Sequence, residues 1–64
     1  MKYSVDAMVG VHILNVVKTD SLARAYRALA NAIDLVENND ATQLLIFDED
    51  NDNKIVASVS SWDL

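Results

Sequence analysis

Residues 3–17 constrain the fold of this chain most, because apolar side chains occupy alternate positions over much of the segment. A period of two places successive side chains on opposite faces, so the pattern predicts a β-strand with one buried face. No Asn-Gly or Asp-Gly pair marks a hairpin here, whereas Gly10 is typical of a bulge or bend. We expect one long strand bent at Gly10. Two strands that meet near Gly10 are the alternative.

The period then changes to that of a helix. Either Asp20 or Ser21 suits the N-cap, since both side chains accept hydrogen bonds from exposed backbone N–H groups. Apolar residues recur at intervals of three and four from Leu22 to Val36, which indicates an amphipathic helix. Asn39 is the expected left-handed residue after it.

Two short strands are expected after the helix. Residues 42–47 are mostly apolar, as in a strand covered on both faces, and residues 55–60 alternate. The whole chain, 1–64, is thus predicted to be a single small α+β domain of order β-α-β-β. Its three- to four-stranded, mainly antiparallel sheet carries one helix packed on one face. A crossover through the helix makes the first strand parallel to residues 42–47, with the last strand between them.

One helix covers only one face of the sheet, so the opposite face is expected to be open. The apolar residues expected there are Met8, Leu14, Val16, Leu45, Phe47 and Val56. An exposed apolar patch of this kind marks a partner site. A chain of 64 residues without cysteine also has little core to stabilise it. For both reasons, and because the long first strand would overhang so small a domain, we expect a homo-oligomer, most simply a dimer.

The net charge of −5 is unevenly distributed along the chain. Residues 1–33 have a net charge of +2, whereas residues 34–64 have a net charge of −7. No basic stripe is present, so binding of nucleic acid through its phosphates is not expected. The acidic half favours a protein partner with a basic surface. No apolar run approaches the roughly 20 residues of a membrane span, and no signal peptide is recognisable, so a cytoplasmic protein is expected.

The segment 48–53 is the one stretch with motif-like spacing. Asp48, Asp50 and Asp52 alternate as in the first half of a calcium-binding loop. However, Asn53 replaces the turn glycine, and Val59 stands where a bidentate glutamate belongs. Three interpretations remain open: a solvated turn, a surface that recognises a basic partner, and weak calcium binding. We expect no metal site.

Catalytic machinery is not apparent in the sequence. His12 is the sole histidine and cysteine is absent, which rules out His-His and Cys-His metal sets. The single glycine excludes a glycine-rich phosphate loop, and no nucleophile elbow is present. The protein is therefore not expected to be an enzyme. Trp62, near the end of the chain, is either a lid over the core or an anchor for a partner.

These observations favour a small acidic protein-binding module that acts by occlusion. In size and charge, the chain resembles phage-encoded inhibitors of bacterial enzymes or defence systems, such as anti-CRISPR proteins. Such a protein would act in the cytoplasm of a bacterial host. The candidate partner-binding residues are Asp48, Glu49, Asp50, Asp52, Phe47 and Trp62.

The predicted β-α-β-β order, the acidity and the length also resemble the dodecins, small flavin-binding proteins that assemble into shells. The resemblance covers most of the chain, at the level of topology. It implies a self-assembling structural or ligand-binding homo-oligomer without catalysis, which is the alternative function. Dodecins have long second and third strands with a flavin-stacking tryptophan in the second. In this chain the corresponding strand, residues 42–47, is short, and the tryptophan is Trp62, near the end of the sequence. No cofactor is therefore expected.

Overall fold

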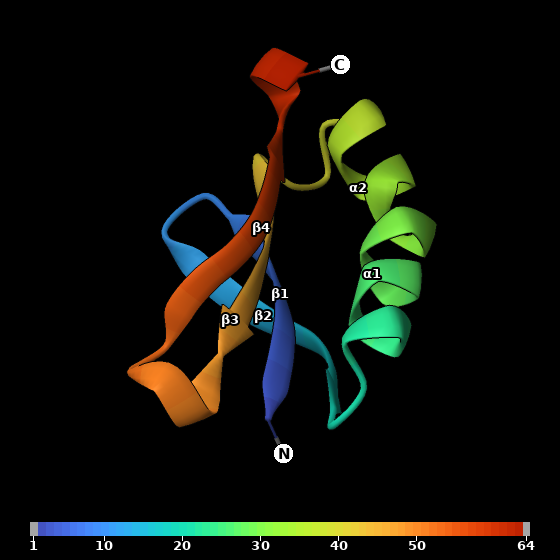
Figure 1. The fold of residues 1–64 in the computed structure, drawn as a ribbon. Coiled ribbons are helices and arrows are strands. Elements are labelled where there is room, and N and C mark those ends of the chain that lie inside the picture. Colours follow the sequence, from blue (N-terminus) through green and yellow to red (C-terminus); the bar gives the residue numbers. More distant parts are fainter. Residues whose placement is uncertain (1, 64) are drawn as a thin grey trace.

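The computed structural model describes residues 2–63, which form an antiparallel sheet of four strands with a helical layer on one face (Figure 1). The predicted α+β class is confirmed. The elements in chain order are β1 (Tyr3–Val9), β2 (His12–Thr19), α1 (Leu22–Asn31), α2 (Ile33–Glu37), β3 (Gln43–Asp48) and β4 (Lys54–Ser60), with short 3-10 turns at Glu49–Asn51 and Ser61–Asp63.

The alternating segment 3–17 forms two strands, so the single bent strand is wrong and the alternative is confirmed. Val9 pairs with His12 across a two-residue turn of Gly10 and Val11. Gly10 has φ 63°, a left-handed conformation that costs glycine little because it has no Cβ. A glycine at the first position of a two-residue turn suits the right-handed twist of a hairpin. The observed order is therefore β-β-α-β-β.

The strands lie in the order β2-β1-β3-β4, and every neighbouring pair is antiparallel. The last strand was expected between the first strand and residues 42–47, and the first strand was expected to run parallel to that segment. Both expectations are wrong, because the hairpin places β1 against β3 and leaves β4 at the edge. It is β2, the strand before the helix, that runs parallel to β3. The overhanging first strand, one basis for expecting a dimer, is absent as well.

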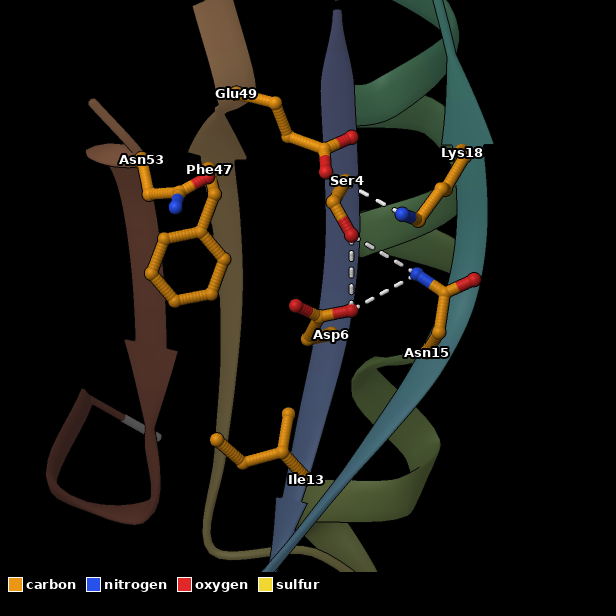
Figure 2. Close-up of a pocket in the computed structure, with 8 residues that line it drawn as sticks. All are labelled: Ser4, Asp6, Ile13, Asn15, Lys18, Phe47, Glu49 and Asn53. Carbon is orange, nitrogen blue, oxygen red and sulfur yellow. Dashed lines mark hydrogen bonds and ion pairs between the residues drawn. The ribbon is translucent and has the colours of Figure 1, made fainter. Parts of the chain in front are cut away.

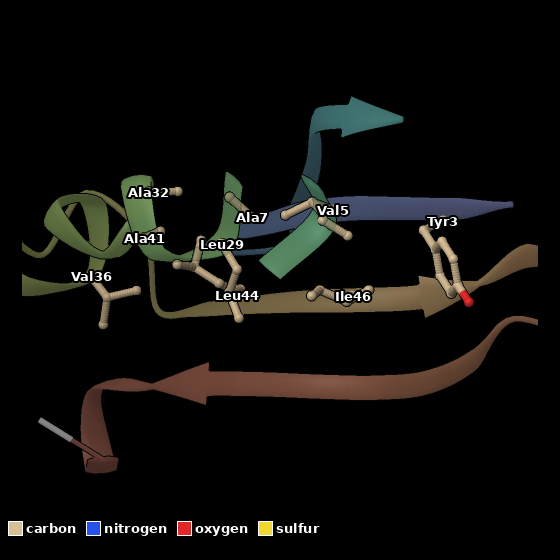
Figure 3. Close-up of a cluster of buried hydrophobic side chains, with 10 residues drawn as sticks. Tyr3, Val5, Ala7, Leu29, Ala32, Val36, Ala41, Leu44 and Ile46 are labelled. Atoms are coloured by element: carbon tan, nitrogen blue, oxygen red, sulfur yellow. The ribbon is translucent and has the colours of Figure 1, made fainter. Parts of the chain in front are cut away.

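The core lies between the helical layer and one face of the two central strands (Figure 3). Val5, Leu44 and Ile46 are fully buried there. The helical layer contributes Ala25, Leu29, Ala32 and Val36. Because two of these four are alanine, the helix approaches the sheet closely, and its packing stabilises the helix more than intrinsic propensity does.

Both ends of the helical layer are capped as the sequence predicts. Ser21 is the N-cap, and its hydroxyl accepts a hydrogen bond from the Arg24 N–H at 3.2 Å. Asp20 instead accepts a hydrogen bond from the Lys2 N–H at 2.9 Å, which ties the start of β1 to the end of β2. Asn39 has φ 62° and ends the layer in the left-handed conformation.

Two bulges change which side chains reach the open face. Paired residues share a face, so Met8, Leu45 and Phe47 lie opposite the helices, as expected. The prediction that Leu14 lies on the open face is wrong, because Leu14 pairs with Ala7 on the helix side. The register shifts at Val16 in β2 and at Val56 in β4, and Val56 packs against the core. An extra residue in one strand moves the side chains beyond it to the other face relative to a strict period of two.

We expect Leu44→Ala to lower the free energy of unfolding by about 2–5 kcal/mol, because it leaves a cavity in a fully buried site. Leu35→Ala is the matched control on the exposed side of α2, with an expected loss within about 1 kcal/mol. Urea denaturation followed by circular dichroism measures both. Equal losses would contradict the position of the core.

Candidate functional site

The open face of the sheet contains a hollow of about 430 Å³ (Figure 2). Side chains from three strands and from the segment after β3 surround it: Ser4, Asp6, Ile13, Asn15, Lys18, Phe47, Glu49 and Asn53. The register explains this gathering, because Ser4 pairs with Lys18 on one side and with Phe47 on the other. The hollow therefore depends on β1 lying between β2 and β3.

A hydrogen-bond network forms one wall of the hollow. The Asn15 side-chain amide donates to Ser4 Oγ and to Asp6 Oδ1, both at 2.9 Å. Ser4 Oγ in turn donates to Asp6 Oδ1 at 3.0 Å. Ser4 is buried, so its hydroxyl needs these partners. The network joins β1 to the edge strand β2 next to the bulge at Val16.

An ion pair lies beside this network. Lys18 Nζ is 3.3 Å from Glu49 Oε2, which links β2 to the acidic turn. Glu49 Oε1 is buried without a hydrogen-bond partner within residues 2–63. The hollow thus contains two carboxylates, Asp6 and Glu49, and one cation, Lys18. Their local charge is −1, with the Phe47 ring on the opposite wall.

The four predicted acidic residues have different structural roles. Asp48 accepts a hydrogen bond from the Asp50 N–H at 3.2 Å and so caps the turn. Glu49 pairs with Lys18. Asp50 and Asp52 are exposed, and neither side chain makes a hydrogen bond within residues 2–63. Of the four, these two are therefore the most accessible to a partner.

Lys2 lies at the same end of the sheet as the acidic turn, and its backbone carbonyl accepts a hydrogen bond from the Glu49 N–H at 2.7 Å. A side-chain hydrogen bond with Tyr3, and then the negative charge of Asp48, raise the pKa of Lys2 above its ordinary value.

The structure brings Phe47 and Glu49 together at the hollow but leaves Trp62 at the far end of β4 (Figures 1 and 2). Trp62 is 92% exposed, so the lid interpretation is wrong. Its role as an anchor stays a prediction. The adjoining Ser61 N–H donates to the Thr42 carbonyl at 3.3 Å, which holds this end of the chain near the start of β3.

No metal-binding group of three or more acidic or histidine side chains occurs within residues 2–63. His12 is exposed at the start of β2. Across the part of the chain that the structure describes, no helix is long and apolar enough to cross a membrane.

Sequence reasoning missed four lining residues as members of one site: the network residues Ser4, Asp6 and Asn15, and Lys18 beside them. A signal was present, because Asn15 interrupts the otherwise apolar run 13–17. A polar amide amid aliphatic residues in a strand needs hydrogen-bond partners, and the alternation of β1 supplies Ser4 and Asp6 on one face.

A comparison of the chain with protein-family models, with curated proteins and with solved structures finds no match.

We expect Asn15→Ala to lower the free energy of unfolding by about 1–3 kcal/mol, because it leaves the buried Ser4 hydroxyl with one partner fewer. Asn51→Ala, in the exposed turn, is the control and should change stability by less than about 0.5 kcal/mol. Thermal and urea denaturation measure both variants. If Asn15→Ala were as mild as the control, the network would not stabilise the fold.

Proposed function

We propose that the protein is a small protein-binding module that covers a site on a partner with a basic surface. The observation that carries the proposal is the uncovered sheet face, where the Phe47 ring lines the same hollow as two carboxylates and one cation. An aromatic side chain next to hydrogen-bonding groups is typical of the centre of a protein interface.

Charge supports a basic partner. The hollow has a local charge of −1, and the exposed Asp50 and Asp52 lie on the turn beside it. A lysine or arginine side chain from the partner would neutralise the negative charge of the hollow. Its aliphatic stem or planar guanidinium group would stack on the Phe47 ring. The overall charge of −5 favours the same kind of partner at long range.

Size supports action by occlusion. The domain measures 30 × 22 × 17 Å, and a face of that size approaches the roughly 800 Å² that each partner contributes to a standard interface. A module that binds without catalysis acts by occupying a surface. The role we propose is inhibition of a bacterial enzyme or defence system, of the kind exerted by phage-encoded inhibitors in the bacterial cytoplasm.

Capture from bacterial lysate with three immobilised baits tests the binding face. The wild-type protein should enrich a partner, identified by mass spectrometry, that Phe47→Ala loses. Tyr26→Ala is the matched control, since it removes a half-exposed aromatic ring from the helical layer. Loss with Tyr26→Ala and retention with Phe47→Ala would place binding on the helical face and contradict the proposal.

Neutralising the exposed acids should slow association with that partner. Asp50→Asn with Asp52→Asn removes two charges without disturbing the turn, because asparagine tolerates the left-handed φ of 56° at position 52. We expect a several-fold lower association rate at low salt, about 3–10-fold, and a weaker response to salt.

Asp34→Asn with Glu37→Gln is the control for this change, with the same change in net charge on α2. Surface plasmon resonance at two salt concentrations distinguishes the pairs. Equal slowing by both would indicate only a net-charge effect, and the acidic turn would then be a solvated loop.

A further inference from the structure

The two edge strands of the sheet differ in how much apolar surface they expose. In β2, Ile13, Leu14 and Val16 are all exposed, and Val11 in the preceding turn is 93% exposed. In β4, Ile55 is exposed, but Val56 and Val59 pack against the core. The exposed aliphatic side chains of the sheet are therefore concentrated at the β2 edge.

The exposed side chains of β2 lie on both faces of the sheet. Ile13 pairs with Met8 on the open face, whereas Leu14 pairs with Ala7 on the helix side. Proteins usually protect an edge strand with charges, proline or a covering segment. From residue 11 to 17, β2 and its turn contain no Asp, Glu, Lys, Arg or Pro.

The backbone of this edge is available as well. Within residues 2–63, β2 makes no backbone hydrogen bond outside its ladder with β1. The Val17 carbonyl, beyond the bulge, accepts a hydrogen bond from the Asn15 side-chain amide at 3.3 Å. The outward N–H and C=O groups before the bulge can thus accept another strand, and burial of the aliphatic side chains would stabilise that pairing.

We infer that β2 pairs antiparallel with β2 of a second copy of this chain, centred on Leu14 in the regular segment before the bulge at Val16. A two-fold axis makes such a surface self-complementary. Leu14 then faces its own equivalent, and Val11 lies near Val17 of the second copy. The inference does not depend on the proposed function.

Charge at this edge does not oppose a second copy, despite the net charge of −5. β2 contains no carboxylate, so the acids of two copies are not brought together by the pairing. Its cation, Lys18, lies near one end of the strand, and antiparallel pairing places the two lysines at opposite ends of the joint ladder. A small domain also gains the apolar burial that its own core lacks.

Sedimentation equilibrium from micromolar to millimolar concentration tests the inference. The wild-type protein should approach twice the monomer mass of 7.1 kDa. Leu14→Lys should raise the dimer dissociation constant by roughly 100-fold. Both copies carry the substitution, so two lysines with the same charge face each other across the two-fold axis. Ile55→Lys is a closely matched control on the other edge strand, with exposures of 54% and 55% for the two wild-type side chains, and it should leave the mass unchanged.

Circular dichroism checks that both variants fold. If Leu14→Lys does not fold, Leu14→Thr keeps strand propensity and should weaken the dimer in the same direction. A second measurement is amide hydrogen exchange, in which outward N–H groups of β2 should gain protection as concentration rises, whereas those of β4 should not. A monomer at millimolar concentration, or a dimer weakened by Ile55→Lys and not by the changes at Leu14, would overturn the inference.

Discussion

The position of β1 between two other strands determines the rest of the structure. β1 is hydrogen-bonded to β2 on one side and to β3 on the other, and its helix-facing side chains Val5 and Ala7 are buried. That position requires the chain to reverse within two residues after Val9. The positive φ of Gly10, the one glycine in the sequence, permits this reversal. Without the turn, β1 and β2 would form one strand and the open-face network would not assemble.

Much of the fold was predictable because local signals agreed. The helix stripe, the cap residues Ser21 and Asn39 and the two later strands each have a clear pattern in the sequence. The hairpin did not, because Gly-Val is a weaker turn signal than Asn-Gly and the apolar period continues through it. The strand order follows from the hairpin, so an error there also misplaced β4.

The candidate site was predictable only in part, for the same physical reason. Composition marks the acidic turn, and Phe47 is the aromatic residue next to it. The network of Ser4, Asp6 and Asn15 depends on the register between β1 and β2, which includes a bulge at Val16. A single sequence shows a period but not a bulge, because an extra residue leaves no compositional trace. The exposure of Trp62 could not be predicted from the sequence either, because it depends on where β4 ends relative to the core.

The alternation of β1 separates two sets of side chains on one strand. Odd-numbered residues such as Val5 and Ala7 face the helical layer and are buried in one packed cluster with Ala25, so larger side chains there would overpack the core. Even-numbered residues such as Ser4 and Asp6 face the open side and contribute nothing to that core. Substitutions in the second set change the exposed surface and the network that joins β1 to β2, but not the packing of the helices. The two sets of positions on one strand therefore act on separate parts of the molecule, the helical layer and the sheet surface.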